Sequence, residues 1–120
     1  MMTINNIYDL GELVIAKGDT FNLKFVFKNE DNTIPDYSGF EGYYILSEMG
    51  YEDSNILSLQ MSLQSGTTNV FTLNVVTEDT QDLDARSYTA KVVLKDENDN
   101  LYKKARGIIT IKEDSLEVGV

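Results

Sequence analysis

Phe21–Lys28 reads FNLKFVFK, a stretch in which apolar and mostly polar side chains alternate. Its apolar positions are Phe21, Leu23, Phe25 and Phe27. Successive side chains of an extended chain point to opposite faces, so this period of two predicts a half-buried β-strand. Burial of one such side chain contributes about 1.5–3 kcal/mol of transfer free energy. This strand alone is therefore expected to anchor a hydrophobic core.

Strand patterns recur on both sides of this stretch. We expect further strands at Leu13–Ile15, Phe40–Met49, Leu57–Leu63, Val70–Val76, Tyr88–Leu94 and Ala105–Ile111. Polar, turn-rich segments separate them at Asn29–Asp36, Gly50–Asn55, Ser65–Asn69 and Asp96–Asn100. Thr77–Ala85 has no strand pattern and predicts a crossover with a single helical turn. These elements leave almost no room for an amphipathic helix.

This pattern predicts an all-β fold, namely an antiparallel immunoglobulin-like β-sandwich of the seven expected strands. A β-barrel is the alternative. A chain of 120 residues has the usual size of one domain. We expect residues 1–112 to form a single β-sandwich domain, and residues 113–120 to form a C-terminal tail that either frays or docks on a neighbour.

Tyr88 stands at the start of an expected strand, directly after the crossover that contains Leu83. In immunoglobulin-like sandwiches a tyrosine at this place packs inward, and its hydroxyl bonds to backbone a few residues upstream. We therefore predict a tyrosine corner at Tyr88, which favours the sandwich over the barrel. An ordinary core tyrosine is the alternative.

The last expected hairpin allows a prediction of its register. A four-residue loop at Glu97–Asn100 pairs Asp96 with Leu101, Lys95 with Tyr102, and Lys91 with Arg106. This register leaves a basic stripe on the outer face, made of Lys91, Lys95, Lys104 and Arg106. Like charges that face each other across strands cost stability. The stripe is therefore either a solvated surface or the complement of an acidic surface elsewhere.

The composition argues against catalysis. The chain has no cysteine and no histidine, so disulfides, thiol nucleophiles, the usual zinc sites and imidazole bases are excluded. Its carboxylates fall in expected turns, where nothing in the sequence fixes an acid–base pair. Asp96–Asn100 has the spacing of half a calcium loop, but Leu101 and Gly107 replace the glycine and glutamate that such a loop requires. We expect no catalytic residue, no cofactor and no bound metal.

Acidic residues dominate the charge. Twenty acidic and ten basic residues give a net charge of −10, which repels nucleic acid and anionic lipid, so neither partner is expected. From Asn29 to Ala85 there is no Lys or Arg. Eleven carboxylates lie there: Glu30, Asp31, Asp36, Glu41, Glu48, Glu52, Asp53, Glu78, Asp79, Asp82 and Asp84. They form either a solvated surface or an acidic patch for a basic partner, and on one continuous surface they would mimic nucleic acid.

Tyrosines offer a second kind of surface. Tyr37 and Tyr51, with Tyr43 and Tyr44, could form an aromatic platform for sugar stacking, although carbohydrate modules more often use tryptophan, which is absent. A carbohydrate-binding or cell-surface adhesion module is therefore the alternative function. The candidate interaction surface combines basic and aromatic residues: Lys91, Lys95, Tyr102, Lys104, Arg106, Tyr43 and Tyr51.

Four pieces of the chain carry a family resemblance. They are Ile15–Phe21 (IAKGDTF), Asp36–Gly39 (DYSG), Thr77–Thr80 (TEDT) with Leu83 and Tyr88, and Arg106–Ile109 (RGII), within Leu13–Lys112. Their order resembles that of small phage and prophage structural domains, a group that includes the N-terminal domain of the phage upper baseplate protein. Two turns depart from the family pattern, because Asp99-Asn100 replaces Asp-Gly and Arg86-Ser87 replaces a glycine before Tyr88.

The resemblance implies a non-enzymatic virion component, a β-sandwich that docks other proteins into a baseplate, tail or capsid-decorating assembly. It carries over no catalytic residue. It implies structural roles for Gly18, Asp19, Leu83 and Tyr88. No secretory signal or membrane-spanning run is visible in the sequence, so we expect synthesis in the bacterial host cytoplasm and residence in the virion. Other virion proteins, or further copies of the chain, are the expected partners.

Overall fold

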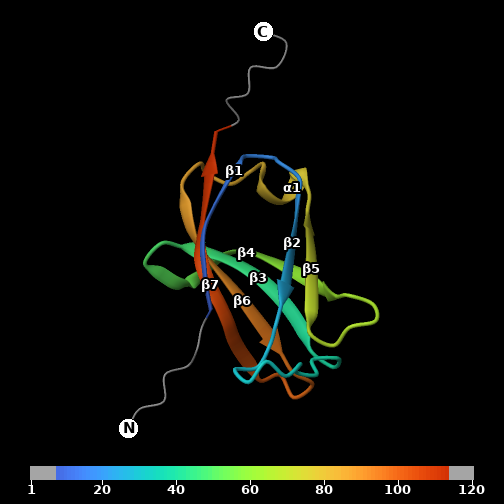
Figure 1. Cartoon of the computed structure of the whole chain (residues 1–120). Helices are drawn as coiled ribbons and strands as arrows, with labels where there is room; N and C mark the ends of the chain where they lie inside the picture. The colour runs from blue at the N-terminus through green and yellow to red at the C-terminus, as the bar shows by residue number, and fades with distance from the viewer. Residues whose placement is uncertain (1–7, 114–120) are drawn as a thin grey trace.

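Seven strands and one helical turn make up residues 8–113, the part of the chain that this computed structural model describes, the side chains of residues 52 and 53 excepted (Figure 1). The strands are β1 (Tyr8–Ala16), β2 (Phe21–Val26), β3 (Glu41–Glu48), β4 (Tyr51–Leu63), β5 (Val70–Val75), β6 (Ser87–Lys95) and β7 (Leu101–Lys112). The helical turn α1 (Thr77–Thr80) lies between β5 and β6. The expected all-β fold of seven strands is confirmed. Residues 114–120 of the expected tail lie outside the described residues.

All seven strands belong to one sheet, in the order β1-β7-β6-β3-β4-β5-β2. The expectation of purely antiparallel pairing is wrong, because β1 runs parallel to β7 and the sheet is therefore mixed. The parallel register sets Ile15 beside Ile111, so the inward side chains of both strands meet over the core. The remaining strand pairs are antiparallel.

The sheet is curled into a half-barrel. β4 joins its two halves, since it pairs with β3 along most of its length and with β5 only at Ser62 and Leu63. β1 and β2 are the terminal strands of the order, so the sheet curls without closing on itself. β1 and β2 are consecutive in sequence, but Figure 1 shows them in separate halves of the sheet.

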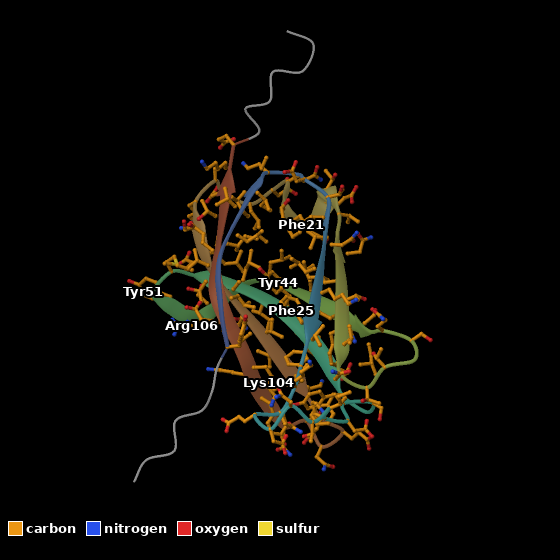
Figure 2. All side chains as sticks on the ribbon, in the orientation of Figure 1. Phe21, Phe25, Tyr44, Tyr51, Lys104 and Arg106 are labelled. Atoms are coloured by element: carbon orange, nitrogen blue, oxygen red, sulfur yellow. The ribbon has the colours of Figure 1, made fainter. Side chains whose placement is uncertain are left out.

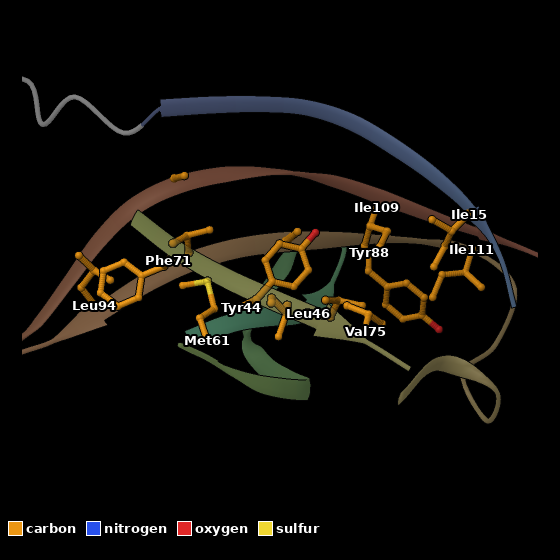
Figure 3. Close-up of a cluster of buried hydrophobic side chains, with 14 residues drawn as sticks. Ile15, Tyr44, Leu46, Met61, Phe71, Val75, Tyr88, Leu94, Ile109 and Ile111 are labelled. Atoms are coloured by element: carbon orange, nitrogen blue, oxygen red, sulfur yellow. The ribbon is translucent and has the colours of Figure 1, made fainter. Parts of the chain in front are cut away.

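The core fills the concave side of the curled sheet. Inward side chains of both halves meet there, among them Tyr44, Leu46, Phe71, Val75, Tyr88, Val92 and Ile109 (Figure 3). Phe25 of β2 stacks on Tyr44 of β3, with 5.9 Å between ring centroids. The alternation that predicted a half-buried strand at Phe21–Lys28 is confirmed, although the strand ends at Val26.

β4 begins earlier than its sequence pattern indicated. Gly50 has φ of +82°, a conformation that glycine adopts at no steric cost, so β3 turns tightly into β4 at Tyr51. The turn expected over Gly50–Asn55 is therefore wrong, because most of that segment already belongs to the strand.

The crossover after β5 is pinned to the turn between β1 and β2. The Gly18 N–H, at a φ of +83°, donates to Oγ1 of Thr80, whose side chain is 2% exposed. In the same turn, Oδ2 of Asp19 accepts a hydrogen bond from the Ala16 N–H at 3.1 Å. Leu83 packs against the core. The predicted helical turn is present, and Gly18 and Asp19 shape the β1–β2 turn.

The tyrosine corner is confirmed. Tyr88 is 1% exposed, and its hydroxyl donates to the carbonyl oxygen of Asp84, four residues upstream, at 2.7 Å. The Arg86 guanidinium lies 5.1 Å from the centroid of the Tyr88 ring. The hydrogen bond from Tyr88 to Asp84 fixes the crossover to the start of β6.

The predicted register of the last hairpin is only partly right. Lys91 faces Arg106 as expected, but Leu101 faces Lys95, and Tyr102 faces Leu94. The loop is therefore one residue longer than predicted, with Asp99 in the left-handed region at a φ of 66°. A bulge restores the register, because Val93 pairs with Lys103 and Val92 pairs with Ala105. Lys104 is the extra residue of that bulge.

Candidate interaction surface

The convex side of β3, β6 and β7 is the surface on which the sequence placed the basic stripe. We call it the outer face, and it comprises the outward residues Tyr43, Ile45, Lys91, Val93, Lys95, Lys103, Arg106 and Ile108. Ile45, Lys91 and Arg106 form one row across the three strands. Lys91 is only 8% exposed, so its aliphatic stem lies among neighbours. The outer face thus combines basic and apolar groups.

Lys95 is held at one end of the outer face by carboxylates. Its Nζ lies 3.3 Å from Oε1 of Glu41, which faces it across the β3–β6 pair, and 3.7 Å from Oδ1 of Asp99. The hydrogen bond and the charge of Glu41 raise the pKa of Lys95, and the hydrogen bond from Lys95 lowers the pKa of Glu41. Lys95 is therefore neutralised locally.

Tyr43 belongs to the same small network. Its hydroxyl donates to Oε2 of Glu41 at 3.2 Å, and the Lys95 ammonium lies 5.9 Å from its ring centroid. Gln60 also donates to Glu41, at 3.3 Å. Sequence reasoning missed the pairing of Glu41 with Lys95. The signal was available only through the β3–β6 register, which no short-range pattern in the sequence reveals.

Lys104 and Tyr102 lie away from this network, in what we call the end cluster: Phe27, Tyr37, Phe40, Tyr102 and Lys104. The Lys104 ammonium lies 5.4 Å from the Tyr37 centroid and 5.9 Å from that of Tyr102. The expected position of Lys104 within the basic stripe is corrected, since the bulge directs its side chain to these rings. Tyr102 donates to Oδ2 of Asp96 at 3.0 Å, and that bond raises the pKa of Tyr102.

The tyrosines do not form a single platform. Tyr51 is 69% exposed at the end of the β3–β4 hairpin, whereas Tyr44 is 3% exposed and lies in the core (Figure 2). Tyr43 lies on the outer face and Tyr37 in the end cluster. The sugar-stacking platform considered from the sequence is therefore not assembled.

The carboxylates between Asn29 and Ala85 lie in separate regions. Glu78, Asp79, Asp82 and Asp84 belong to the crossover around α1, and Glu30, Asp31 and Asp36 to the loop after β2 at the opposite end (Figure 1). Glu41 and Glu48 are in ion pairs with Lys95 and Arg86. The described carboxylates do not form one continuous surface, so mimicry of nucleic acid loses its basis. The side chains of Glu52 and Asp53 lie outside the described residues.

The half calcium loop serves as a turn. Oδ1 of Asp96 accepts the backbone N–H groups of Asn98 and Asn100, both at 2.9 Å, and Oδ2 accepts the Tyr102 hydroxyl. A cavity of about 370 Å³ lies beside it, between the loops at Asp36–Phe40 and Asp96–Asn98. Among the side chains that the structure describes, no group of three acidic residues is placed to hold a metal ion.

No helix of the described part is both long and apolar enough to cross a membrane. No protein-family model and no curated protein matches the chain.

Proposed function

We propose that the chain is a non-enzymatic structural protein of a bacteriophage or prophage virion, an immunoglobulin-like assembly module that acts through protein–protein contacts. The outer face carries this proposal. Its row of Ile45, Lys91 and Arg106 places basic groups beside the exposed side chain of Ile108 on a protein of net charge −10. Arginine and apolar side chains together are typical of interface centres.

The fold supports the immunoglobulin-like assignment. The β2–β5 half of the sheet packs over the β3–β6–β7 half through contacts such as Phe25 on Tyr44. The tyrosine corner at Tyr88 lies where the chain crosses from β5 to β6, which is its place in immunoglobulin-like sandwiches. The four sequence pieces that resemble phage domains supply the virion assignment.

The partner of the outer face is expected to present carboxylates around an apolar patch. Electrostatic complementarity of this kind sets orientation and suppresses wrong partners. The acidic crossover of a neighbouring copy meets the charge requirement, and so would another acidic virion protein.

Incorporation into particles tests the proposal. A tagged chain is expressed during particle assembly, and its copy number in purified particles is compared with that of Arg106→Glu/Ile108→Ser. We expect the wild type in the particles and at least a tenfold loss for the variant, because a buried charge mismatch costs several kcal/mol. Lys24→Glu/Val26→Ser makes the same change on outward positions of β2 and is the matched control. Particles that lack the wild-type chain, or that retain both variants equally, would contradict the proposal.

A further inference from the structure

A second surface lies where the half-barrel stays open. We call it the seam, the gap between the free edges of β1 and β2. It holds a cavity of about 190 Å³, whose lining includes Leu10, Leu13, Leu23, Tyr44, Ala90 and Gly107. An apolar cavity of about 150 Å³ is large enough to bind benzene. The seam therefore has room for an aliphatic side chain between two strand edges.

The side chains along the seam face the core but are incompletely covered. Leu10 and Leu13 of β1, and Leu23 and Phe25 of β2, are half-buried, although all four pack against the core. Inward residues on the central strands, such as Leu46 and Val92, are almost fully buried. The core thus lacks apolar cover along one line, and that line runs between two strand edges with free backbone groups.

Tyr44 provides an independent sign that something is missing there. Its side chain is 3% exposed and lines the seam, yet no described residue accepts a hydrogen bond from its hydroxyl. Figure 3 shows the Tyr44 oxygen directed away from β3, toward β1 and β7. Burial raises the pKa of Tyr44 to about 12. Buried hydroxyls are nearly always hydrogen-bonded, so this donor calls for an acceptor inside the seam.

An added β-strand meets all of these requirements. It would pair with the free edges, place alternate apolar side chains over the half-buried residues, and offer a backbone carbonyl to the Tyr44 hydroxyl. The segment Ser115–Val120 has the necessary sequence, since Leu116, Val118 and Val120 alternate with small or charged residues. The opposite terminal segment, Met1–Ile7, breaks its alternation at Asn5-Asn6.

The strand must come from another copy of the chain. Oε1 of Glu113 lies 3.7 Å from Nζ of Lys17, which belongs to the β1–β2 turn. To enter the seam of its own copy, the segment would have to pass β1 sideways by two strand spacings, about 9.6 Å, and also reverse its direction. Asp114, the one residue between Glu113 and the segment, spans at most about 3.6 Å when extended. A neighbouring copy has no such restriction.

We propose that the seam binds Ser115–Val120 of a second copy as an added β-strand, with a backbone carbonyl of that strand accepting the Tyr44 hydroxyl. This contact uses a different surface from the outer face and links identical copies head to tail. Head-to-tail contacts of this kind generate rings or open filaments.

Disulfide trapping tests the proposal, because the chain has no cysteine of its own. The full-length variant Leu23→Cys/Val118→Cys is oxidised and separated on a non-reducing gel. We expect a ladder of dimers and larger species. In the control Ile34→Cys/Val118→Cys, an exposed loop residue replaces the seam position. We expect it to form such species at least tenfold more slowly. Asn22→Cys, on the outward side of β2, replaces Leu23→Cys if that variant does not fold.

Three results would overturn the proposal. One is a cross-link found only within the monomer, and another is a ladder that forms no faster than in the control. The third is preferential cross-linking of Leu23→Cys to Met2→Cys, which would assign the seam to the N-terminal segment. Adding Tyr44→Phe to the trapping pair should slow ladder formation about fivefold, the usual effect of one lost hydrogen bond. An unchanged rate would refute the role of Tyr44. Failure of the outer-face experiment leaves these outcomes unaffected.

Discussion

Two buried tyrosines of the core differ in whether their hydroxyl groups have a hydrogen-bond acceptor. Tyr88 and Tyr44 are both almost fully buried, at 1% and 3% exposure. Tyr88 donates to the Asp84 carbonyl, whereas Tyr44 has no acceptor among the described residues. The first hydroxyl is therefore a structural bond, and the second is a buried polar group that costs free energy in the isolated chain.

Removal of the two hydroxyls should separate these roles. Tyr88→Phe is expected to lower the free energy of unfolding by about 1–2 kcal/mol, because the Asp84 carbonyl loses its partner. Tyr44→Phe keeps the ring stacked on Phe25 and should be neutral or slightly stabilising in the monomer. Urea unfolding of both variants measures the difference. Equal losses would mean that the Tyr44 hydroxyl already has an acceptor in the monomer.

At the scale of elements, the β6–β7 hairpin contains two departures from ideal pairing that cancel. Its loop is one residue longer than predicted, and the bulge at Lys104 adds one residue to β7. The register of Lys91 with Arg106 is therefore the one that the sequence predicted, although the pairs nearer the loop are shifted. Because side chains alternate with a period of two, this compensation keeps Ala105, Ile109 and Ile111 in the core.

Deletion of Lys104 should show that the bulge compensates for the longer loop. Without the extra residue, either the loop must tighten or β7 must slip by one position, which would turn its inward side chains to solvent. We expect a loss of more than about 3 kcal/mol in unfolding free energy, comparable to large core disruptions. Lys104→Ala retains the bulge and removes only the contacts with Tyr37 and Tyr102, for about 0.5–1 kcal/mol. Similar losses for both would show that the bulge is dispensable.

The sequence predicted what depends on local pattern. Alternation located all seven strands, and the position of Tyr88 after the crossover identified the tyrosine corner. It did not predict the early start of β4, which depends on a tight turn at Gly50, or the parallel pairing of β1 with β7. These features depend on backbone geometry and on contacts between distant segments. A sequence pattern with a period of two contains no information about either.

The candidate site was also predictable only where it depends on local pattern. Alternation placed Lys91, Lys95 and Arg106 correctly on the outer face. Local pattern could not show that Glu41 neutralises Lys95, or that the bulge moves Lys104 to the end cluster. The seam was also missed, because an open edge is a property of the whole sheet. The sequence contained one signal for it, the doublet Tyr43-Tyr44. Neighbouring residues in a strand face opposite sides, so one of these two hydroxyl groups had to point into the core.

At the scale of the whole molecule, two acidic segments, the crossover around α1 and the loop after β2, lie at opposite ends (Figure 1), and the net charge is −10. Repulsion of this kind destabilises a compact state and is screened by salt. The exposed ion pairs, such as Arg86 with Glu48, contribute little and oppose this trend only weakly.

Added sodium chloride should therefore stabilise the protein. Between low ionic strength and about 0.15 M we expect the unfolding free energy to rise by on the order of 1 kcal/mol, measured by urea unfolding. Glu78→Gln/Asp82→Asn, which removes two charges from the crossover, should reduce the dependence on salt. A fall in stability with salt would mean that ion pairs outweigh the net repulsion.

The parallel pairing of β1 with β7 also determines when the chain can finish folding. β7 begins about 85 residues after β1 ends, so on the ribosome β1 remains without its partner until β7 has been made. At about 5–20 residues per second, that wait lasts roughly 4–17 s. Closure of so long a loop also predicts slow refolding in vitro. During this interval the nascent chain exposes Leu13 and Ile15, and exposed apolar strand residues of this kind are prone to aggregation.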